Sequence, residues 1–292
     1  MQKNNITYLL LKSSWTLLSF IPLSIMYIFS DILFYPFYYV IRYRRKVARK
    51  NLVESFPEKN KKEIVKIEKR FYRFFLDLYF ETRKSASISI EEMRKRMKFT
   101  NIEEVNKVLA SGKSISLYLG HYCNWEWISS MPLSLNKDSI SGQIYKRLSS
   151  VPVNKLLLKN RSRFGAVSVE MKETMRWISS CISEGKATIT GYIADQSPKL
   201  RDSKYFLEFL NHQAPVLTGA EKITKRYGLE AYYLNVSRIK RGYYEASFVR
   251  LHEEPKTLPD YELTKIYYEH LERSIRINPE FYLWTHNRFK HS

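Results

Sequence analysis

The sequence predicts an α/β fold, in which a layered central sheet is flanked by helices and preceded by an N-terminal hydrophobic helical membrane anchor. From about residue 100 onward, short runs of β-branched and aromatic residues alternate with longer amphipathic runs, a pattern typical of layered α/β domains. Two apolar stretches precede residue 42. We therefore assign residues 1–50 to the anchor and its basic flank, and residues 51–292 to one α/β domain.

The anchor is predicted from charge and length. Residues 13–30 contain no charged side chain, and a second apolar stretch covers 32–41. Eighteen helical residues span about 27 Å, close to the hydrocarbon thickness of a bilayer. Because Pro22 and Asp31 interrupt the pattern, one span, a shallow helical hairpin and a tilted anchor all stay open. A buried helix hairpin of a water-soluble protein is the competing interpretation.

A basic cluster follows the second apolar stretch directly. It consists of Arg42, Arg44, Arg45, Lys46, Arg49 and Lys50. Basic residues next to an apolar helix favour the cytoplasmic side of a membrane and anionic lipid headgroups. We therefore expect the catalytic part to face the cytoplasm.

The first half of the domain predicts two helices and one strand. Apolar residues recur at helical spacing over 60–84, with basic residues on the other face. Asn101 and Glu104 have the spacing of a capping box, so a second helix is expected from there to Ser111, ended by Gly112. The run 114–119 (SISLYL) predicts a short buried strand.

The second half continues the alternation. Strands are predicted over 139–145, 187–194, 229–236 and 243–249, and helices over 154–163, 170–184, 216–227 and 260–277. The last two strands are expected to pair across a turn at 240–242, since Gly242 permits a tight turn.

His121 and Glu126, separated by four residues, are the predicted catalytic pair. Gly120 ends the strand 114–119, and Asn124 is a suitable cap for a helix that starts near Trp125. This places His121 at the carboxyl end of a strand and Glu126 in the first helical turn behind it, where α/β enzymes commonly carry their chemistry. A carboxylate that fixes the tautomer of a histidine makes it a general base for a hydroxyl. The same spacing also occurs by chance in many proteins.

The cysteines argue against a metal site and against a disulfide framework. Cys123 and Cys181 are far apart in the sequence, and no H-E-x-x-H or C-x-x-C pattern is present. We predict no metal, no cofactor and a reducing compartment.

The formal net charge of +20 predicts an anionic partner. Nucleic acid, an anionic membrane surface and an acidic substrate would each fit that charge. The apolar N-terminus favours the membrane and argues against a nucleic-acid-binding protein, which would need a basic stripe but no hydrophobic anchor.

Six segments together carry a family resemblance. They are Arg45 to Leu52 (RKVARKNL), 120–127 (GHYCNWEW), Ile144-Tyr145-Lys146, Arg161-Ser162-Arg163-Phe164-Gly165, Ile193-Ala194-Asp195-Gln196 and 279–290 (PEFYLWTHNRFK). In these segments the chain resembles the lipid A biosynthesis acyltransferases, or late acyltransferases, within the lysophospholipid acyltransferase superfamily. The last segment is far more specific than the H-x4-E pattern alone, and the resemblance covers nearly the whole chain.

The resemblance implies transfer of a fatty acyl chain from an acyl carrier protein thioester to a hydroxyl of a lipid A precursor. It implies a glycerolipid acyltransferase-like fold at the cell inner membrane, and His121 and Glu126 as the catalytic residues. The substrate-binding residues that it implies are Lys146, Arg161, Arg163 and Asp195. Backbone amides near the helix start, or one of the two arginines, would stabilise the oxyanion. An acyltransferase acting on another membrane lipid, such as a glycerolipid or an amino-acid lipid, remains an alternative.

Two positions depart from the family pattern. Arg147 stands where many members have proline, and Gln196-Ser197-Pro198-Lys199 replaces a histidine-rich turn. These differences concern the choice of donor chain and acceptor more than the chemistry.

Overall fold

The computed structural model describes residues 2–198, 203 and 205–291. Seven strands form the central sheet in the order β1-β9-β8-β2-β5-β3-β4. They are β1 (Met97–Thr100), β2 (Ile115–Leu119), β3 (Ile140–Tyr145), β4 (Val167–Glu170), β5 (Thr188–Ile193), β8 (Glu230–Lys240) and β9 (Tyr243–His252). All neighbouring strands are parallel except β8 and β9. The predicted fold class, a helix-flanked and mostly parallel α/β sheet, is confirmed.

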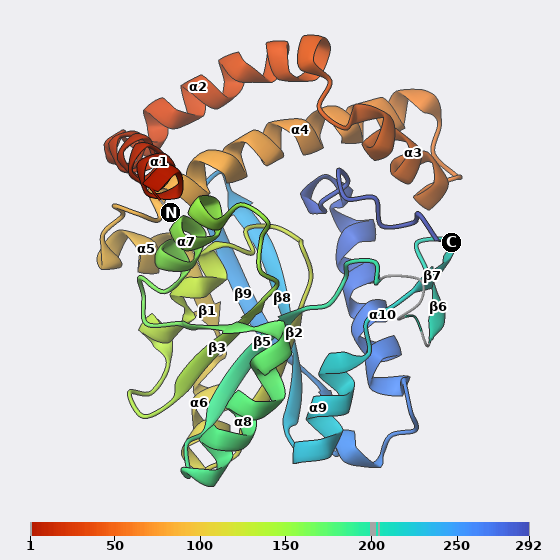
Figure 1. Cartoon of the computed structure of the whole chain (residues 1–292). Helices are drawn as coiled ribbons and strands as arrows, with labels where there is room; N and C mark the ends of the chain where they lie inside the picture. Colours follow the sequence, from red (N-terminus) through yellow and green to blue (C-terminus); the bar gives the residue numbers. More distant parts are fainter. Residues whose placement is uncertain (1, 199–202, 204, 292) are drawn as a thin grey trace.

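Helices cover the faces and one end of this sheet. They are α1 (Gln2–Phe20), α2 (Leu23–Tyr35), η1 (Pro36–Ile41), α3 (Arg45–Ser55), α4 (Lys61–Lys84), α5 (Ile90–Arg96), α6 (Ile102–Ala110), α7 (Val151–Arg161), α8 (Thr174–Ser183), α9 (Gly219–Tyr227) and α10 (Glu262–Ile277). Short helical turns are η2 (Trp127–Ser134), η3 (Met171–Glu173), η5 (Pro255–Thr257) and η6 (Pro279–Phe281). Figure 1 shows α4 crossing one end of the sheet, with α1 and α2 outside it.

Strand β2 lies at the centre of the sheet, and all five of its residues are buried. Parallel neighbours β5 and β8 flank it on its two edges. Burial on both faces is typical of a central parallel strand, and the polar Ser116 is buried here together with its apolar neighbours. The predicted pairing of β8 with β9 is confirmed, with Arg241 and Gly242 in the connecting turn.

Long helix α4 begins as its sequence predicts. The Asn60 side chain accepts hydrogen bonds from the backbone of Lys62 and Glu63, and the Glu63 carboxylate accepts one from the Asn60 backbone. This reciprocal capping box satisfies amide groups that the first turn of a helix leaves free.

The capping box predicted at Asn101 is wrong. Asn101 adopts a left-handed backbone with φ of 47°, and its side chain makes no cap hydrogen bond to the helix. Its amide instead bonds both the N–H and the C=O of Phe248, at 3.0 and 2.9 Å. Pairing between β1 and β9 ends at Ser247, so the next residue, Phe248, offers a free donor and acceptor together, and this contact outcompetes the local cap.

Other differences are local. The helix predicted near Trp125 is the 3₁₀ helix η2, which contains Pro132, although Asn124 does accept a hydrogen bond from Trp127 N at 3.0 Å. The sequence interpretation missed β1, β4 and the hairpin of β6 (Phe206–Phe209) and β7 (His212–Pro215). The boundary between residues 50 and 51 falls within α3 and stays a prediction.

Candidate active site

His121 follows the buried strand β2 directly after Gly120. Two contacts fix the chain at this point: Tyr267 donates a hydrogen bond to the Leu119 carbonyl at 3.0 Å, and α10 packs closely against Gly120. A Cβ atom at Gly120 would lie 2.6 Å from Leu271 Cδ1. A larger residue at Gly120 would therefore require the buried Leu271 side chain to move, so glycine favours the close packing of the strand end against α10.

Asp195 is the carboxylate that binds His121. The two atoms His121 Nδ1 and Asp195 Oδ1 lie 2.7 Å apart, and the His121 backbone N–H donates to Asp195 Oδ2 at 3.0 Å. Sheet register brings them together, since Leu119 of β2 pairs with Ile193 of β5. His121 is the second residue after Leu119, and Asp195 is the second residue after Ile193. Because parallel strands end at the same edge of the sheet, the two side chains meet there.

The charge on Asp195 is set by its surroundings. Its side chain is buried, and burial alone raises the pKa of this carboxyl. The His121 ring, two hydrogen bonds from His121 and the charge of Arg288 outweigh that effect, so that the pKa of Asp195 lies below its usual value. Asp195 is therefore an ionised acceptor, and it fixes the proton of His121 on Nδ1.

The other ring nitrogen, Nε2, is left as the acceptor. The Gln196 side-chain amide lies 3.2 Å from His121 Nε2, and the Trp125 ring stands edge-on to the imidazole at 5.3 Å between ring centroids. An amide N–H that donates to Nε2 requires an unprotonated nitrogen there, and the acceptor hydroxyl would take the place of this amide. The arrangement presents a basic nitrogen next to an aromatic wall.

Glu126, the predicted partner of His121, binds Arg161 instead. Arg161 donates from Nε and Nη2 to the two carboxylate oxygens of Glu126, at 2.9 and 2.6 Å. Burial raises the pKa of Glu126, but the Arg161 guanidinium and the nearby His121 bring it below its usual value. The expectation that Glu126 orients the imidazole thus differs from the geometry. The short separation between His121 and Glu126 in the sequence suggested that they are in contact. The contact with His121 is made instead by Asp195, which follows the neighbouring strand β5.

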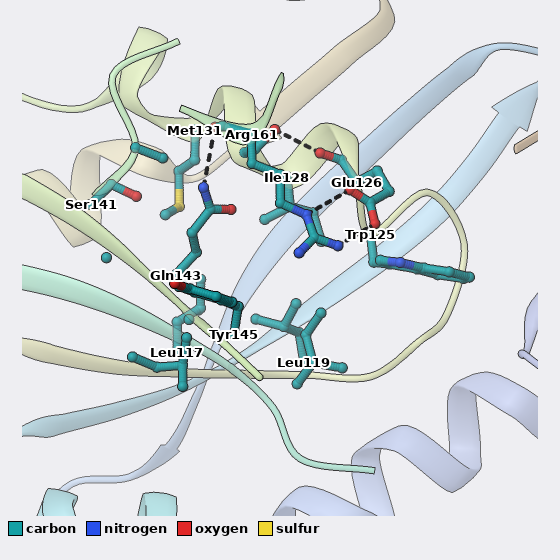
Figure 2. Close-up of a pocket in the computed structure, with 16 residues that line it drawn as sticks. Leu117, Leu119, Trp125, Glu126, Ile128, Met131, Ser141, Gln143, Tyr145 and Arg161 are labelled. Atoms are coloured by element: carbon teal, nitrogen blue, oxygen red, sulfur yellow. Dashed lines mark hydrogen bonds and ion pairs between the residues drawn. The ribbon is translucent and has the colours of Figure 1, made fainter. Parts of the chain in front are cut away.

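A cavity of about 50 Å³ lies beside this ion pair, between β2, β3, β5 and η2. Its apolar wall is formed by Leu117, Leu119, Trp125, Ile128, Met131, Ile144, Ala166 and Ile193. Figure 2 shows Glu126 and Arg161 bonded at one side of it, and the Gln143 side chain of β3 bonded to the Arg161 carbonyl. The volume has room for only a few water-sized groups, and its lining suits an apolar ligand.

The C-terminal segment clamps the loop that carries His121. Leu283 N donates to the His121 carbonyl at 3.1 Å, and Cys123 N donates to the Phe281 carbonyl at 3.0 Å. The two segments form an isolated antiparallel bridge between Tyr122 and Tyr282. These backbone bonds hold the catalytic loop from the side opposite the sheet.

A comparison with protein families identifies the family of the chain. Residues 3–291 match the family model of bacterial lipid A biosynthesis acyltransferases. The chain belongs to this family. It is therefore an O-acyltransferase of lipid A biosynthesis, and the lipid acceptor is the substrate that the family indicates. A comparison with curated proteins gave no match.

The remaining substrate-binding residues predicted for the acyltransferase lie in different surroundings. Lys146 is exposed just after β3, whereas Arg161 is committed to Glu126. Arg163 donates from Nη1 to the Ser85 carbonyl at 2.9 Å and lies over the Phe164 ring. Their roles in substrate binding stay predictions. Within residues 2–198, 203 and 205–291, no group of three or more His, Cys, Asp or Glu side chains has a metal-binding arrangement.

Arg288, in the C-terminal motif of the acyltransferase, is buried beside the His121–Asp195 pair. Its Nη2 donates to the Tyr268 hydroxyl at 3.2 Å, while Nε and Nη1 have no hydrogen-bond partner within the described part of the chain. The neighbouring His286 is half-buried, and burial lowers its pKa to about 4. A neutral His286 leaves Arg288 as the positive charge that balances Asp195.

Glu81 of α4 holds the catalytic loop and was missed by the sequence interpretation. Its carboxylate accepts hydrogen bonds from Asn124 Nδ2, Tyr27 and Tyr244, at 2.7, 2.7 and 2.8 Å, and Trp127 Nε1 donates to its backbone carbonyl at 3.0 Å. Burial raises the pKa of this fully enclosed carboxyl. A signal existed, because Glu81 continues the apolar stripe of α4, where a carboxylate needs partners.

Glu81→Ala is expected to lower the free energy of unfolding by at least about 2 kcal/mol, because two buried donors, Asn124 and Tyr244, would each lose a partner at about 1–3 kcal/mol. Chemical denaturation monitored by tryptophan fluorescence measures the change. Glu81→Gln, which keeps one acceptor oxygen and a similar volume, is the matched control and should lose less. Equal stability of Glu81→Ala and the wild type would show that the buried network does not hold this loop.

Proposed function

We propose that this acyltransferase moves a fatty acyl chain from an acyl carrier protein thioester to a hydroxyl of a lipid A precursor, with His121 as general base. The observation that carries the proposal is the His121–Asp195 pair at the end of β2, next to Trp125, which also lines the apolar cavity. A hydroxyl becomes a competent nucleophile when a positioned imidazole removes its proton.

The reaction would proceed in two proton-coupled steps. His121 Nε2 takes the proton of the acceptor hydroxyl as its oxygen attacks the thioester carbonyl, and Asp195 stabilises the imidazolium that forms. The tetrahedral intermediate then breaks its carbon–sulfur bond, and the departing sulfur takes the proton from Nε2. The ester product and the free carrier thiol leave, with His121 restored.

A covalent acyl-cysteine intermediate has little support. Cys123 is fully buried, and burial raises the pKa of its thiol well above the usual value. A buried protonated thiol is a poor nucleophile. Direct attack by the acceptor hydroxyl requires only the base that the site already contains.

Charge supports an acidic carrier protein as donor and an anionic membrane as location. The chain has a formal net charge of +20, which would steer acidic partners toward it. One helix in the described residues, Leu23–Ile41, is long and apolar enough to cross a membrane, which is weak evidence of a span. We propose that the enzyme works at the cytoplasmic side of the cell inner membrane.

The purified enzyme tests donor and acceptor together. It would be incubated with an acyl carrier protein thioester or a coenzyme A thioester, and with a lipid A precursor or a lysophospholipid, at low and high salt. We expect acylation of the lipid A precursor, faster with the carrier and slowed by salt. A faster, salt-independent reaction with coenzyme A would refute the carrier as donor. Transfer only to the lysophospholipid would refute the acceptor.

Lys146→Glu is expected to raise KM for the carrier thioester by about tenfold while kcat stays nearly unchanged, since an exposed charge near the site entrance would act on docking alone. Steady-state kinetics at low salt measures both constants. Lys256→Glu, an equally exposed lysine at the far end of β9, is the control and should leave KM unchanged. A fall in kcat equal to the fall in kcat/KM would instead assign Lys146 to the transition state.

A further inference from the structure

Helix α2 and the turn η1 lie antiparallel along α4 over their whole length. Three side-chain hydrogen bonds join them: Tyr27 to Glu81, Ser30 to Asp77, and Tyr38 to Glu68, at 2.7, 2.7 and 2.8 Å. The contacts pair rising residue numbers in α2 and η1 with falling residue numbers in α4, which is the order expected for antiparallel helices. Figure 1 shows the two helices running across the same end of the molecule.

An ion-pair cluster fastens the middle of α2 to the sheet as well. Arg241, in the turn between β8 and β9, binds Asp31 at 2.8 and 3.0 Å and Asp77 at 2.6 and 3.0 Å. The Asp77 side chain is 3% exposed. Separating α2 from the body would remove Asp31 from Arg241 and the Ser30 hydroxyl from the buried Asp77 carboxylate, so the cluster favours the packed position of α2.

The link between α1 and α2 is attached to the body too. Lys84 at the end of α4 donates from Nζ to the carbonyls of Ser19 and Ile21, at 2.8 and 3.1 Å. The apolar segment, which consists of α1, α2 and η1, is therefore held against α4 at the link between α1 and α2, in the middle of α2 and in η1. Since α4 has lysines, arginines and glutamates along its length, it is not itself a candidate to cross a bilayer.

The face of this segment that points away from α4 is apolar and exposed. Its exposed large side chains are Ile6, Leu9, Leu10, Leu17, Phe20, Ile25, Ile28, Phe29, Ile32, Leu33, Tyr35, Tyr39, Val40 and Ile41. Only 22% of the apolar window in 23–41 is buried. Exposed apolar side chains in this number mark an interaction surface, and a helix with one packed face and one apolar open face is typical of proteins that lie within one leaflet.

Cations border this apolar face on the neighbouring helices. Four of them lie over aromatic rings of the segment: Arg73 over Phe34 at 4.2 Å, Lys69 over Tyr39 at 5.5 Å, Arg83 over Trp15 at 4.5 Å and Lys155 over Tyr8 at 4.6 Å. Aromatic rings and long basic side chains at the edge of an apolar surface match the headgroup layer of an anionic membrane.

We infer that α1, α2 and η1 lie in the plane of the membrane within one leaflet and do not cross it. This inference rests on the membrane location in the proposed function and specifies its form. The partner is the acyl-chain and headgroup region of one anionic leaflet. Because Glu81 joins Tyr27 of α2 to Asn124 of the catalytic loop, this arrangement holds the His121 loop at the membrane surface, within reach of a lipid acceptor.

Depth-dependent fluorescence quenching tests the arrangement. Single cysteines would replace Ile25, Ile32 and Val40, which are 43%, 59% and 77% exposed, and carry a small fluorophore. The full-length protein would be bound to vesicles of mixed anionic and zwitterionic phospholipid with nitroxides at defined depths. Lys256→Cys, far from this face, is the aqueous control. The unsubstituted protein gives the labelling background, since Cys123 and Cys181 are buried.

The in-plane arrangement predicts the same shallow depth at all three positions. A crossing helix would instead place Ile32 about 10 Å deeper than Ile25, at 1.5 Å per residue, and that gradient would overturn the inference. Failure of the protein to bind vesicles would overturn both the inference and the membrane part of the proposed function. Acyl transfer to a lipid A precursor in detergent micelles remains a separate measure of the chemistry.

Discussion

His121→Ala is expected to lower kcat for acyl transfer by about 10⁴-fold, the upper end of what a positioned general base contributes. The reason is that Nε2 is the only ring nitrogen of His121 not bonded to Asp195, and the substitution leaves the acceptor hydroxyl without a base. The rate would be measured with the purified enzyme and saturating donor and acceptor.

The control for this variant is its fold. The His121 side chain is only 16% exposed, so its truncation leaves a cavity and is expected to lower the melting temperature, and thermal unfolding monitored by circular dichroism should still show one cooperative transition. A folded His121→Ala enzyme with nearly normal turnover would eliminate general-base catalysis by this residue.

Asp195→Asn is expected to lower kcat by up to about 10⁴-fold, because an amide in place of the buried carboxylate favours the wrong tautomer in a comparable triad. The asparagine side chain is nearly isosteric with the aspartate that it replaces, so KM for the lipid should change little. In the double variant His121→Ala/Asp195→Asn, no further loss is expected, since Asp195 acts through His121.

Glu126→Gln separates the two carboxylates. The Glu126 carboxylate binds Arg161 at the wall of the cavity. Loss of this ion pair should weaken the wall, and it should lower kcat less than Asp195→Asn does. A greater loss with Glu126→Gln than with Asp195→Asn would assign the orienting role to Glu126, as its spacing from His121 suggests.

The fold class could be predicted from local patterns. The apolar run of β2 and the glycine after it place His121 at a strand end, because burial and chain reversal leave direct traces in the sequence. The stripe on α4 likewise predicts a long amphipathic helix. These features depend on residues within a few turns of one another.

The partner of His121 could not be predicted in the same way. Asp195 lies 74 residues further along the chain, and only the pairing of β2 with β5 brings it to the imidazole. Strand order is not written in any local pattern, so the nearer Glu126 was the natural candidate. Once the register is known, the two strand ends fix the contact.

The N-terminus and Asn101 illustrate the same limit. Length and apolarity of 23–41 satisfy the criteria for a span, but they do not reveal that Tyr27, Ser30 and Tyr38 bind α4. At Asn101 a correct local signal for a cap is outcompeted by β9. In both cases a tertiary partner decides between conformations that the local sequence allows.

The most direct test of the account is mass spectrometry of membrane lipids from lipid A-producing cells that lack the chain, express it, or express the folded His121→Ala variant. The account predicts that a lipid A precursor gains the mass of one fatty acyl chain only in cells with the wild-type protein. An unchanged lipid profile, or the same added chain in cells with His121→Ala, would contradict it.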